Sequence, residues 1–376
     1  MKKTVKAAVA LSVLAAPAYA ANLENPLYMP TQGTVYSKTS VGVMYKKADA
    51  SQAQKKKEHA GATEFPIWRL HEELGYGITD RLELYGKFGY THDGDIDRKG
   101  MHLGRAGLKY RVIDTDTGFA WDLYSDAQLG GISEMSGSYA ANGFTYDNYS
   151  NGRWGFHVGT QFGRTWSKFT AAAFAEVLRT FGNDNNSIDV SNFKVEKLGG
   201  VPVTSLGIPS EISVDLKSTT EFNAGLKTFY QIDDRWSVGG SFTWKRHEDN
   251  GVKGLATSLG SVDQTVATKV AVAGVMAAQP TLSQEQALQY VMAQPALITG
   301  AGVQAQQQVV AGLLNEVADM NDGFDEYIFN VTVANQITDA MQVAVYGEYT
   351  FDNGHRQSQN TTDVKAELGV RLNVRF

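Results

Sequence analysis

The sequence contains no cysteine, and only 8 of its 376 residues are proline. A disulfide framework is therefore excluded, even for a chain exported to an oxidising compartment. Beyond the first 20 residues no apolar run approaches the roughly 20 residues of a transmembrane helix, and a mean hydropathy of −0.27 is too polar for a helical membrane protein. Nucleic-acid binding is not indicated either, because 34 Lys and Arg stand against 40 Asp and Glu.

Aromatic residues and glycine are abundant instead. The chain has 17 Tyr, 17 Phe and 6 Trp beside 38 Gly. A closed transmembrane barrel uses such a mixture, because alternate residues of each strand face lipid and a polar lumen. Composition thus favours strands over helices as the main element of the chain.

Residues 1–20 have the composition of a secretory signal peptide. Three lysines come first, an apolar stretch follows over residues 7–16, and Ala18-Tyr19-Ala20 supplies a small-x-small cleavage site. The apolar stretch is too short to span a bilayer. We expect cleavage after Ala20, which leaves residues 21–376 as a single domain.

The last fifteen residues alternate between apolar and polar side chains, which is the period of a β-strand. The apolar positions are Leu368, Val370, Leu372, Val374 and Phe376. This pattern resembles the closing strand of Gram-negative outer-membrane β-barrel proteins, in which it is the assembly signal. The resemblance implies an outer-membrane location with both termini in the periplasm. It also implies the barrel assembly machinery, outer-membrane lipids and lipopolysaccharide as partners.

Short turns and long loops alternate along the rest of the chain. The short turns lie near residues 79–81, 114–117, 165–168, 232–236 and 337–341. The longer polar loops lie at about 48–63, 92–99, 133–150, 183–216, 249–323 and 353–361. Between them we count about twelve strands, which predicts an all-β, antiparallel up-and-down transmembrane barrel. A soluble β-sandwich also alternates, but it would not segregate its turns and loops so regularly.

Residues 251–323 do not alternate and are predicted to be helical. Ser261 with Gln264, and Ser283 with Gln286, have the spacing of capping boxes. We expect this insertion to lie in one long extracellular loop. A loop of this length in a barrel is usually functional or disordered. Two placements are open: a lid over the outer mouth, which we favour, or a plug folded into the lumen.

Alternation also predicts which charged side chains face the lumen. A barrel of twelve strands is intermediate between a filled one of eight and an open one of sixteen. Charged residues in such a lumen form a solute pathway if water reaches them, and otherwise pair and fill it. The predicted lumen-lining residues carry both signs: Arg69, Arg81, Glu83, Lys87, Arg105, Lys109, Asp122, Asp126, Arg153, Glu221, Lys227 and Glu348.

The sequence contains no complete residue pattern for catalysis or metal binding. A barrel lipid hydrolase requires a nucleophile beside a histidine, and the nearest approach is His355 with Ser358, in a predicted loop. Asp93, Asp95 and Asp97 have the first spacings of a calcium loop, but the later positions depart from that pattern. We therefore predict no catalytic residue, no metal and no cofactor.

Three functions are consistent with these observations. The first is a porin-like channel for the passive passage of small polar solutes. The second is a structural or surface-contact barrel with an occluded lumen. The third and least favoured is an outer-membrane lipid hydrolase. The sequence alone favours the channel.

Overall fold

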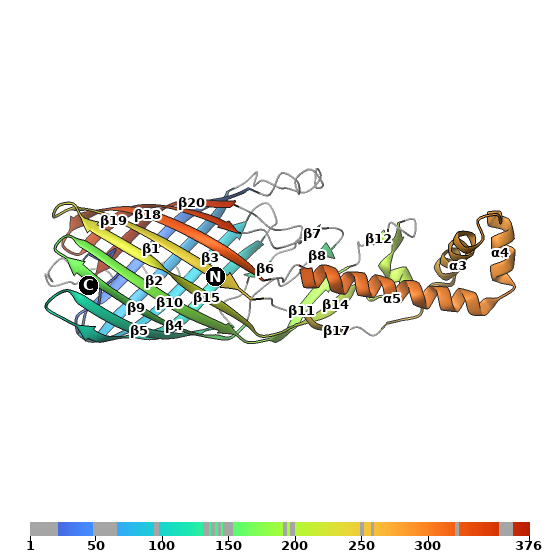
Figure 1. Cartoon of the computed structure of the whole chain (residues 1–376), viewed down its shortest axis with the longest axis horizontal. Coiled ribbons are helices and arrows are strands. Elements are labelled where there is room, and N and C mark those ends of the chain that lie inside the picture. The colour runs from blue at the N-terminus through green and yellow to red at the C-terminus, as the bar shows by residue number, and fades with distance from the viewer. Residues whose placement is uncertain are drawn as a thin grey trace, which may run out of the picture.

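The structure is a computed structural model (Figure 1). It describes residues 22–47, 66–93, 98–130, 135–136, 140–141, 144–145, 153–190, 194–195, 200–248, 252–256, 259–319, 323–352 and 364–376. The predicted signal peptide, much of the long loops and the pair His355 and Ser358 lie outside these residues. Asp95 and Asp97 of the calcium-like spacing also lie outside them.

The described chain forms a closed antiparallel barrel of twelve long strands, as the sequence predicted. Closure is made by β1 and β20, whose register pairs Val41 with Val370. Backbone hydrogen bonds around the closed ring leave no free sheet edge, which the interior of a membrane requires. The strands are β1 (Val35–Lys47), β2 (Ile67–Thr79), β3 (Leu82–Asp93), β4 (Arg98–Asp114), β5 (Phe119–Gln128), β9 (Gly155–Trp166), β10 (Phe169–Thr180), β15 (Thr219–Gln231), β16 (Trp236–His247), β18 (Phe324–Thr338), β19 (Met341–Asp352) and β20 (Val364–Arg375).

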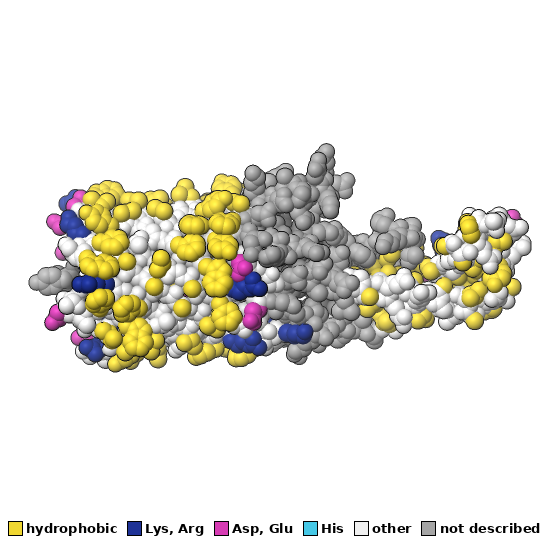
Figure 2. Space-filling view, in the orientation of Figure 1, with side chains coloured by type: hydrophobic (Ala, Val, Ile, Leu, Met, Phe, Trp, Pro, Cys, Tyr) yellow, Lys and Arg dark blue, Asp and Glu magenta, His cyan; other side chains and the backbone are white. Residues whose placement is uncertain are grey.

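Alternation separates an apolar outer face from a polar inner face. Figure 2 shows hydrophobic side chains over the outside of the barrel, gathered toward its two ends. Exposed aromatic residues contribute to this surface, as expected where a barrel meets the two membrane interfaces. They include Tyr45, Tyr76, Tyr90, Trp154, Tyr230, Trp236, Trp244 and Tyr349.

All five tight connections lie at one end of the barrel. They join β2 to β3, β4 to β5, β9 to β10, β15 to β16 and β18 to β19. The start of β1 and the end of β20 lie at the same end, because Tyr36 pairs with Arg375. We call this the short-turn end and the opposite one the long-loop end. The predicted turn positions are thus confirmed.

Beyond the long-loop end the chain builds a separate extension (Figure 1). Five short strands form a second sheet in the order β17-β14-β11-β8-β7, and β12 pairs with β13. Their bounds are β7 (Ala140–Ala141), β8 (Phe144–Thr145), β11 (Asn183–Asp189), β12 (Lys194–Val195), β13 (Val201–Pro202), β14 (Glu211–Leu216) and β17 (Val252–Ala256). The strand β6 (Met135–Ser136) instead extends the barrel sheet beside β4.

Helices of the insertion complete this extension. They are α3 (Gln264–Ala278), α4 (Gln284–Met292) and α5 (Pro295–Asp319), with a 3-10 turn at Val203–Leu206. Two apolar clusters hold them: Leu206 and Ile212 pack with Leu313, and Ala287 and Val291 pack with Ile298. The helices lie outside the barrel, so the plug placement is wrong for them (Figure 1). The lid placement stays a prediction.

The two predicted helix starts have different outcomes. Ser283 and Gln286 form the expected capping box at α4. At α3 the N-cap is Asp263 rather than Ser261, and its carboxylate accepts hydrogen bonds from the backbone N–H groups of Thr265 and Val266. These hydrogen bonds lower the pKa of Asp263, because they stabilise its charged form. Among the described helices, none is long and apolar enough to cross a membrane.

We predict that the extension can be unfolded without loss of the barrel. Val291→Asp would bury a charge between α3, α4 and α5 at a cost of several kcal/mol, roughly the penalty of an unpaired buried ion. Limited proteolysis should then cleave the helices rapidly, while the heat-modifiable gel mobility of the folded barrel is unchanged. Leu288→Asp, at an exposed position of the same helix, is the matched control and should leave proteolysis unchanged. Loss of the barrel in Val291→Asp would show that the two parts fold together.

Candidate functional site

The lumen is the candidate functional site, because the inner faces of the strands concentrate most of the predicted charged residues there. Glu83, Asp122 and Asp126 are buried in its wall. Glu348 lies on β19, opposite Asn330 of β18. Seven further predicted residues make lumen contacts or lie at its ends, namely Arg69, Lys87, Arg105, Lys109, Arg153, Glu221 and Lys227.

Two predicted residues lie away from the middle of the lumen. Arg81 is exposed in the tight turn between β2 and β3. Arg153 precedes β9 at the long-loop end, where its Nε donates a hydrogen bond of 2.8 Å to the carbonyl of Phe181. Alternation assigns a side chain to a face of the sheet but not to a height in the barrel, so the sequence could not separate these two from the rest.

One cluster of charges lies on β1 to β4. The Glu73 carboxylate lies 3.2 Å from the Lys38 ammonium and 3.7 Å from that of Lys87. Lys109 lies 2.7 Å from Glu83. The hydroxyl of Tyr36 joins the two carboxylates, at 3.0 Å from Glu73 and 2.5 Å from Glu83. Tyr36 and Lys38 were not among the predicted lumen residues, although their alternation with exposed residues on β1 is the signal that would have found them.

A second cluster surrounds His157. Its Nδ1 lies 2.7 Å from Asp126 and its Nε2 lies 3.6 Å from Glu176. Tyr85 donates a hydrogen bond to Asp126, and Tyr124 donates one to Glu176. The position of His157 between two carboxylates fits a structural ion cluster. Among the described residues, no group of acidic or histidine side chains has the arrangement of a metal site.

A third cluster lies near the long-loop end. Glu221 lies 3.1 Å from both Lys245 and His247. Glu326 lies 3.1 Å from His247 and 2.6 Å from Lys365. The three clusters together distribute ion pairs around the wall, on β1 to β4, on β3 to β10 and on β15 to β20.

The segment of residues 22–34, which we call the N-terminal segment, crosses the lumen at the short-turn end. The Glu24 carboxylate accepts hydrogen bonds from Arg371 at 2.9 Å and from Asn373 at 2.7 Å, both on β20. Asn22 donates hydrogen bonds to Gln231 of β15 and Ser237 of β16. These contacts span several sides of the barrel, so the segment occupies the lumen rather than one wall.

Barrel side chains also bind the backbone of this segment. Gln161 donates to the carbonyl of Pro26, Arg111 to that of Leu27 and Lys109 to that of Tyr28. Three successive carbonyls are thereby hydrogen-bonded without forming a strand. The position of this segment was not predicted from the sequence, because an irregular segment has no period. Its only sequence signals are Pro26 and Pro30 and the polar residues Asn22, Glu24 and Asn25.

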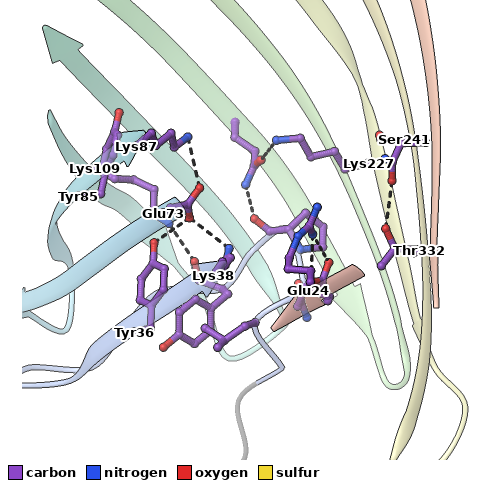
Figure 3. Close-up of a pocket in the computed structure, with 18 of the residues that line it drawn as sticks. Glu24, Tyr36, Lys38, Glu73, Tyr85, Lys87, Lys109, Lys227, Ser241 and Thr332 are labelled. Atoms are coloured by element: carbon purple, nitrogen blue, oxygen red, sulfur yellow. Dashed lines mark hydrogen bonds and ion pairs between the residues drawn. The ribbon is translucent and has the colours of Figure 1, made fainter. Parts of the chain in front are cut away.

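A cavity of about 300 Å³ remains between the N-terminal segment and the wall (Figure 3). It is lined by residues of eleven barrel strands, and by Leu23, Glu24, Asn25, Pro26 and Tyr28 of the segment. This volume is at the lower bound of small-molecule sites, which run from roughly 300 to 1,000 Å³. The N-terminal segment thus narrows the lumen at the short-turn end, and the cavity beside it is large enough to hold a small solute.

Glycine makes room for the tyrosines of the wall. The ring of Tyr36 lies over Gly75, its partner on β2, so closely that a Cβ at Gly75 would clash with the ring. Tyr124 lies over Gly159 in the same way. These close approaches set the position of the hydroxyls that bind the lumen carboxylates.

We predict that Gly75→Val destabilises the barrel by about 1–3 kcal/mol, the usual cost of overpacking, because Tyr36 must leave its two carboxylates. Urea unfolding in lipid vesicles measures the change. Gly347→Val is the control, since a Cβ at Gly347 meets nothing within 4 Å. Equal stability of the two variants would contradict the role of the Tyr36 packing.

Comparison with protein-family models gave no match, and comparison with curated proteins gave none either. Among solved structures, an outer-membrane channel from Pseudomonas putida F1 is similar with a TM-score of 0.50 and 11% identity, over 95% of this chain and 99% of that chain. The toluene transporter TodX from Pseudomonas putida has a TM-score of 0.43 and 7% identity, over 96% and 94% of the two chains. The NanC porin has a TM-score of 0.38 and 8% identity, over 88% and 98%.

The first of these likenesses, at a TM-score of 0.50 and 11% identity, shows a shared fold alone. It agrees with the closed barrel described above. The chain therefore has the fold of that outer-membrane channel, a closed antiparallel β-barrel.

Proposed function

We propose that the protein is an outer-membrane channel for the passive passage of small polar solutes, narrowed at its short-turn end by the N-terminal segment. The observation that carries this proposal is the cavity of about 300 Å³ enclosed between that segment and a charged wall. An occluded barrel would fill this space with side chains.

The ion pairs of the lumen run along its wall rather than across it, which supports a solute pathway. Lys38 and Glu73 lie on the neighbouring strands β1 and β2, and Lys245 and Glu221 lie on β16 and β15. Neighbouring strands are only about 4.8 Å apart, so such pairs run along the wall and leave the barrel axis free. Each ion pair described above between barrel residues joins neighbouring strands or strands separated by one other. Pairs that only filled the lumen would also connect opposite walls.

In this proposal the channel lies in the bacterial outer membrane with the short-turn end toward the periplasm. The long-loop end and its helical extension then face the outside, where they meet lipopolysaccharide. The C-terminal strand, with Phe376 at its end, binds the barrel assembly machinery. These placements follow from the likeness to bacterial barrels, whose short turns are periplasmic.

A second candidate, the structural or surface-contact barrel, is favoured by one observation. The N-terminal segment is fixed to β4, β9, β10, β15, β16, β19 and β20 by side-chain hydrogen bonds. If it never moves, solutes do not pass, and the protruding extension becomes the functional part. The two candidates differ in whether the barrel conducts.

Single-channel conductance of the refolded protein in planar bilayers separates these candidates. We expect small, steady openings from the full chain. In Glu24→Ala the segment loses charge-assisted hydrogen bonds to Arg371 and Asn373, which are worth about 2 kcal/mol each. The fraction of molecules whose segment has left the lumen should therefore rise more than ~tenfold, and larger openings should become more frequent by the same factor.

Glu285→Ala, at an exposed position of α4, is the control and should conduct like the unchanged chain. Silence from every variant, with the barrel shown to be folded, would contradict the channel and support the structural barrel. Unchanged conductance in Glu24→Ala would show that the N-terminal segment is not the constriction.

A further inference from the structure

One lysine in the cavity has no carboxylate at ion-pair distance, although Glu176 lies close enough to interact with its charge. Among the described residues, no carboxylate lies within the 4.0 Å of an ion pair around the Lys227 ammonium on β15. Its contacts are Oε1 of Gln161 at 3.4 Å and the face of the Phe174 ring, whose centroid is 4.5 Å away. An ammonium held by one weak hydrogen bond and one ring still has donors to offer to an anion.

The four carboxylates of the cavity are, in contrast, all occupied. Glu24 is bound by Arg371, and Glu73 by Lys38 and Lys87. Glu83 is bound by Lys109. Glu176 accepts a hydrogen bond of 2.6 Å from Tyr124 and lies near His157. The acidic residues therefore have little capacity left for a cationic solute.

The balance of charge around the cavity is positive. Its lining contains five cationic side chains and four carboxylates, which leaves an excess of one positive charge. Lys87 shares its carboxylate partner, Glu73, with Lys38, and approaches it only to 3.7 Å. In Figure 3 Lys87 and Lys227 point into the cavity from opposite sides. Two incompletely neutralised ammonium groups thus face one space.

The wall near Lys227 is polar but uncharged. Ser241 of β16 and Asn330 and Thr332 of β18 line it, together with Gly239. Ser241 and Asn330 are register partners, and the Thr332 hydroxyl donates to the Asn330 side chain at 3.0 Å. Hydroxyl and amide groups of this kind both donate and accept hydrogen bonds, which suits the hydroxyl groups of a solute.

We propose that this cavity is a binding site for a small hydroxylated carboxylate. The solute's carboxylate lies between the ammonium groups of Lys227 and Lys87, and its hydroxyl groups face Ser241, Asn330 and Thr332. This proposal rests on the proposed channel, in which the cavity is a station on the pathway, and it names the class of solute. The volume of about 300 Å³ admits one such molecule at a time.

Isothermal titration calorimetry on the full chain in detergent tests the proposal, with gluconate as the probe. Glucose has a similar size and hydroxyl content but no carboxylate, and it should bind at least about tenfold more weakly, because the charge-assisted hydrogen bonds are lost. Inorganic phosphate is an anion without the hydroxylated chain and should also bind more weakly. An affinity for gluconate no greater than that for glucose would overturn the proposal. Phosphate binding as tight as gluconate binding would overturn the part of the proposal in which the wall recognises the solute's hydroxyl groups.

Variants locate the site. Lys227→Met keeps much of the length and removes the charge, so it should weaken gluconate binding at least about tenfold, whereas Lys227→Arg should retain most of it. Lys245→Met is the matched control: Lys245 lies on the neighbouring strand, is paired with Glu221 at 3.1 Å and does not line the cavity. Equal weakening in both methionine variants would show a diffuse charge effect and overturn the site. Heat-modifiable gel mobility verifies that each variant is folded.

Calorimetry keeps this test separate from the channel test, because binding does not require conduction. Conduction without gluconate binding would overturn the site and leave the channel proposal intact. Gluconate binding without conduction would support the site as a pocket and overturn the channel.

Discussion

Backbone hydrogen bonding around a closed ring determines how the interior of this barrel is built. A sheet that spans a bilayer can leave no free N–H or C=O group in lipid, so β20 must return to β1. Closure then confines every second side chain to a narrow interior. Charged residues such as Asp122 and Glu83 are buried there and must be neutralised locally, and Arg111 and Lys109 on β4 do so.

Local neutralisation explains how a charged lumen can also contain free space. Pairs between neighbouring strands satisfy their charges along the wall, and tyrosines above glycines add the remaining hydrogen bonds. The N-terminal segment then occupies the short-turn end without completing a strand, because arginine, lysine and glutamine side chains bind its carbonyls. What remains is a cavity with an excess of positive charge. The bound N-terminal segment, the paired charges of the wall and the remaining cavity therefore all follow from the closed, polar interior.

The sequence predicted the parts of this fold that have a period. Strand alternation and the tight turns fixed the number of strands and their order, and Ser283 with Gln286 marked the start of α4. It could not predict the N-terminal segment, whose irregular backbone has no repeating pattern. Nor could it assign heights: Arg81 and Lys87 share an alternation phase, yet one lies in a turn and the other in the cavity. The helices of the insertion were predictable from their spacing, whereas the sequence left their placement open between a lid and a plug.

Thiol accessibility tests whether the N-terminal segment lies inside the lumen, and the chain suits this test because it has no cysteine of its own. Leu27→Cys places a thiol at a position that is 7% exposed, against Ala120 and Ala172 of the barrel wall. A polyethylene-glycol maleimide too large to enter the barrel should label it only after unfolding, whereas Glu285→Cys on the exposed surface of α4 should be labelled at once. Equally fast labelling of both cysteines in the folded protein would place Leu27 outside the lumen.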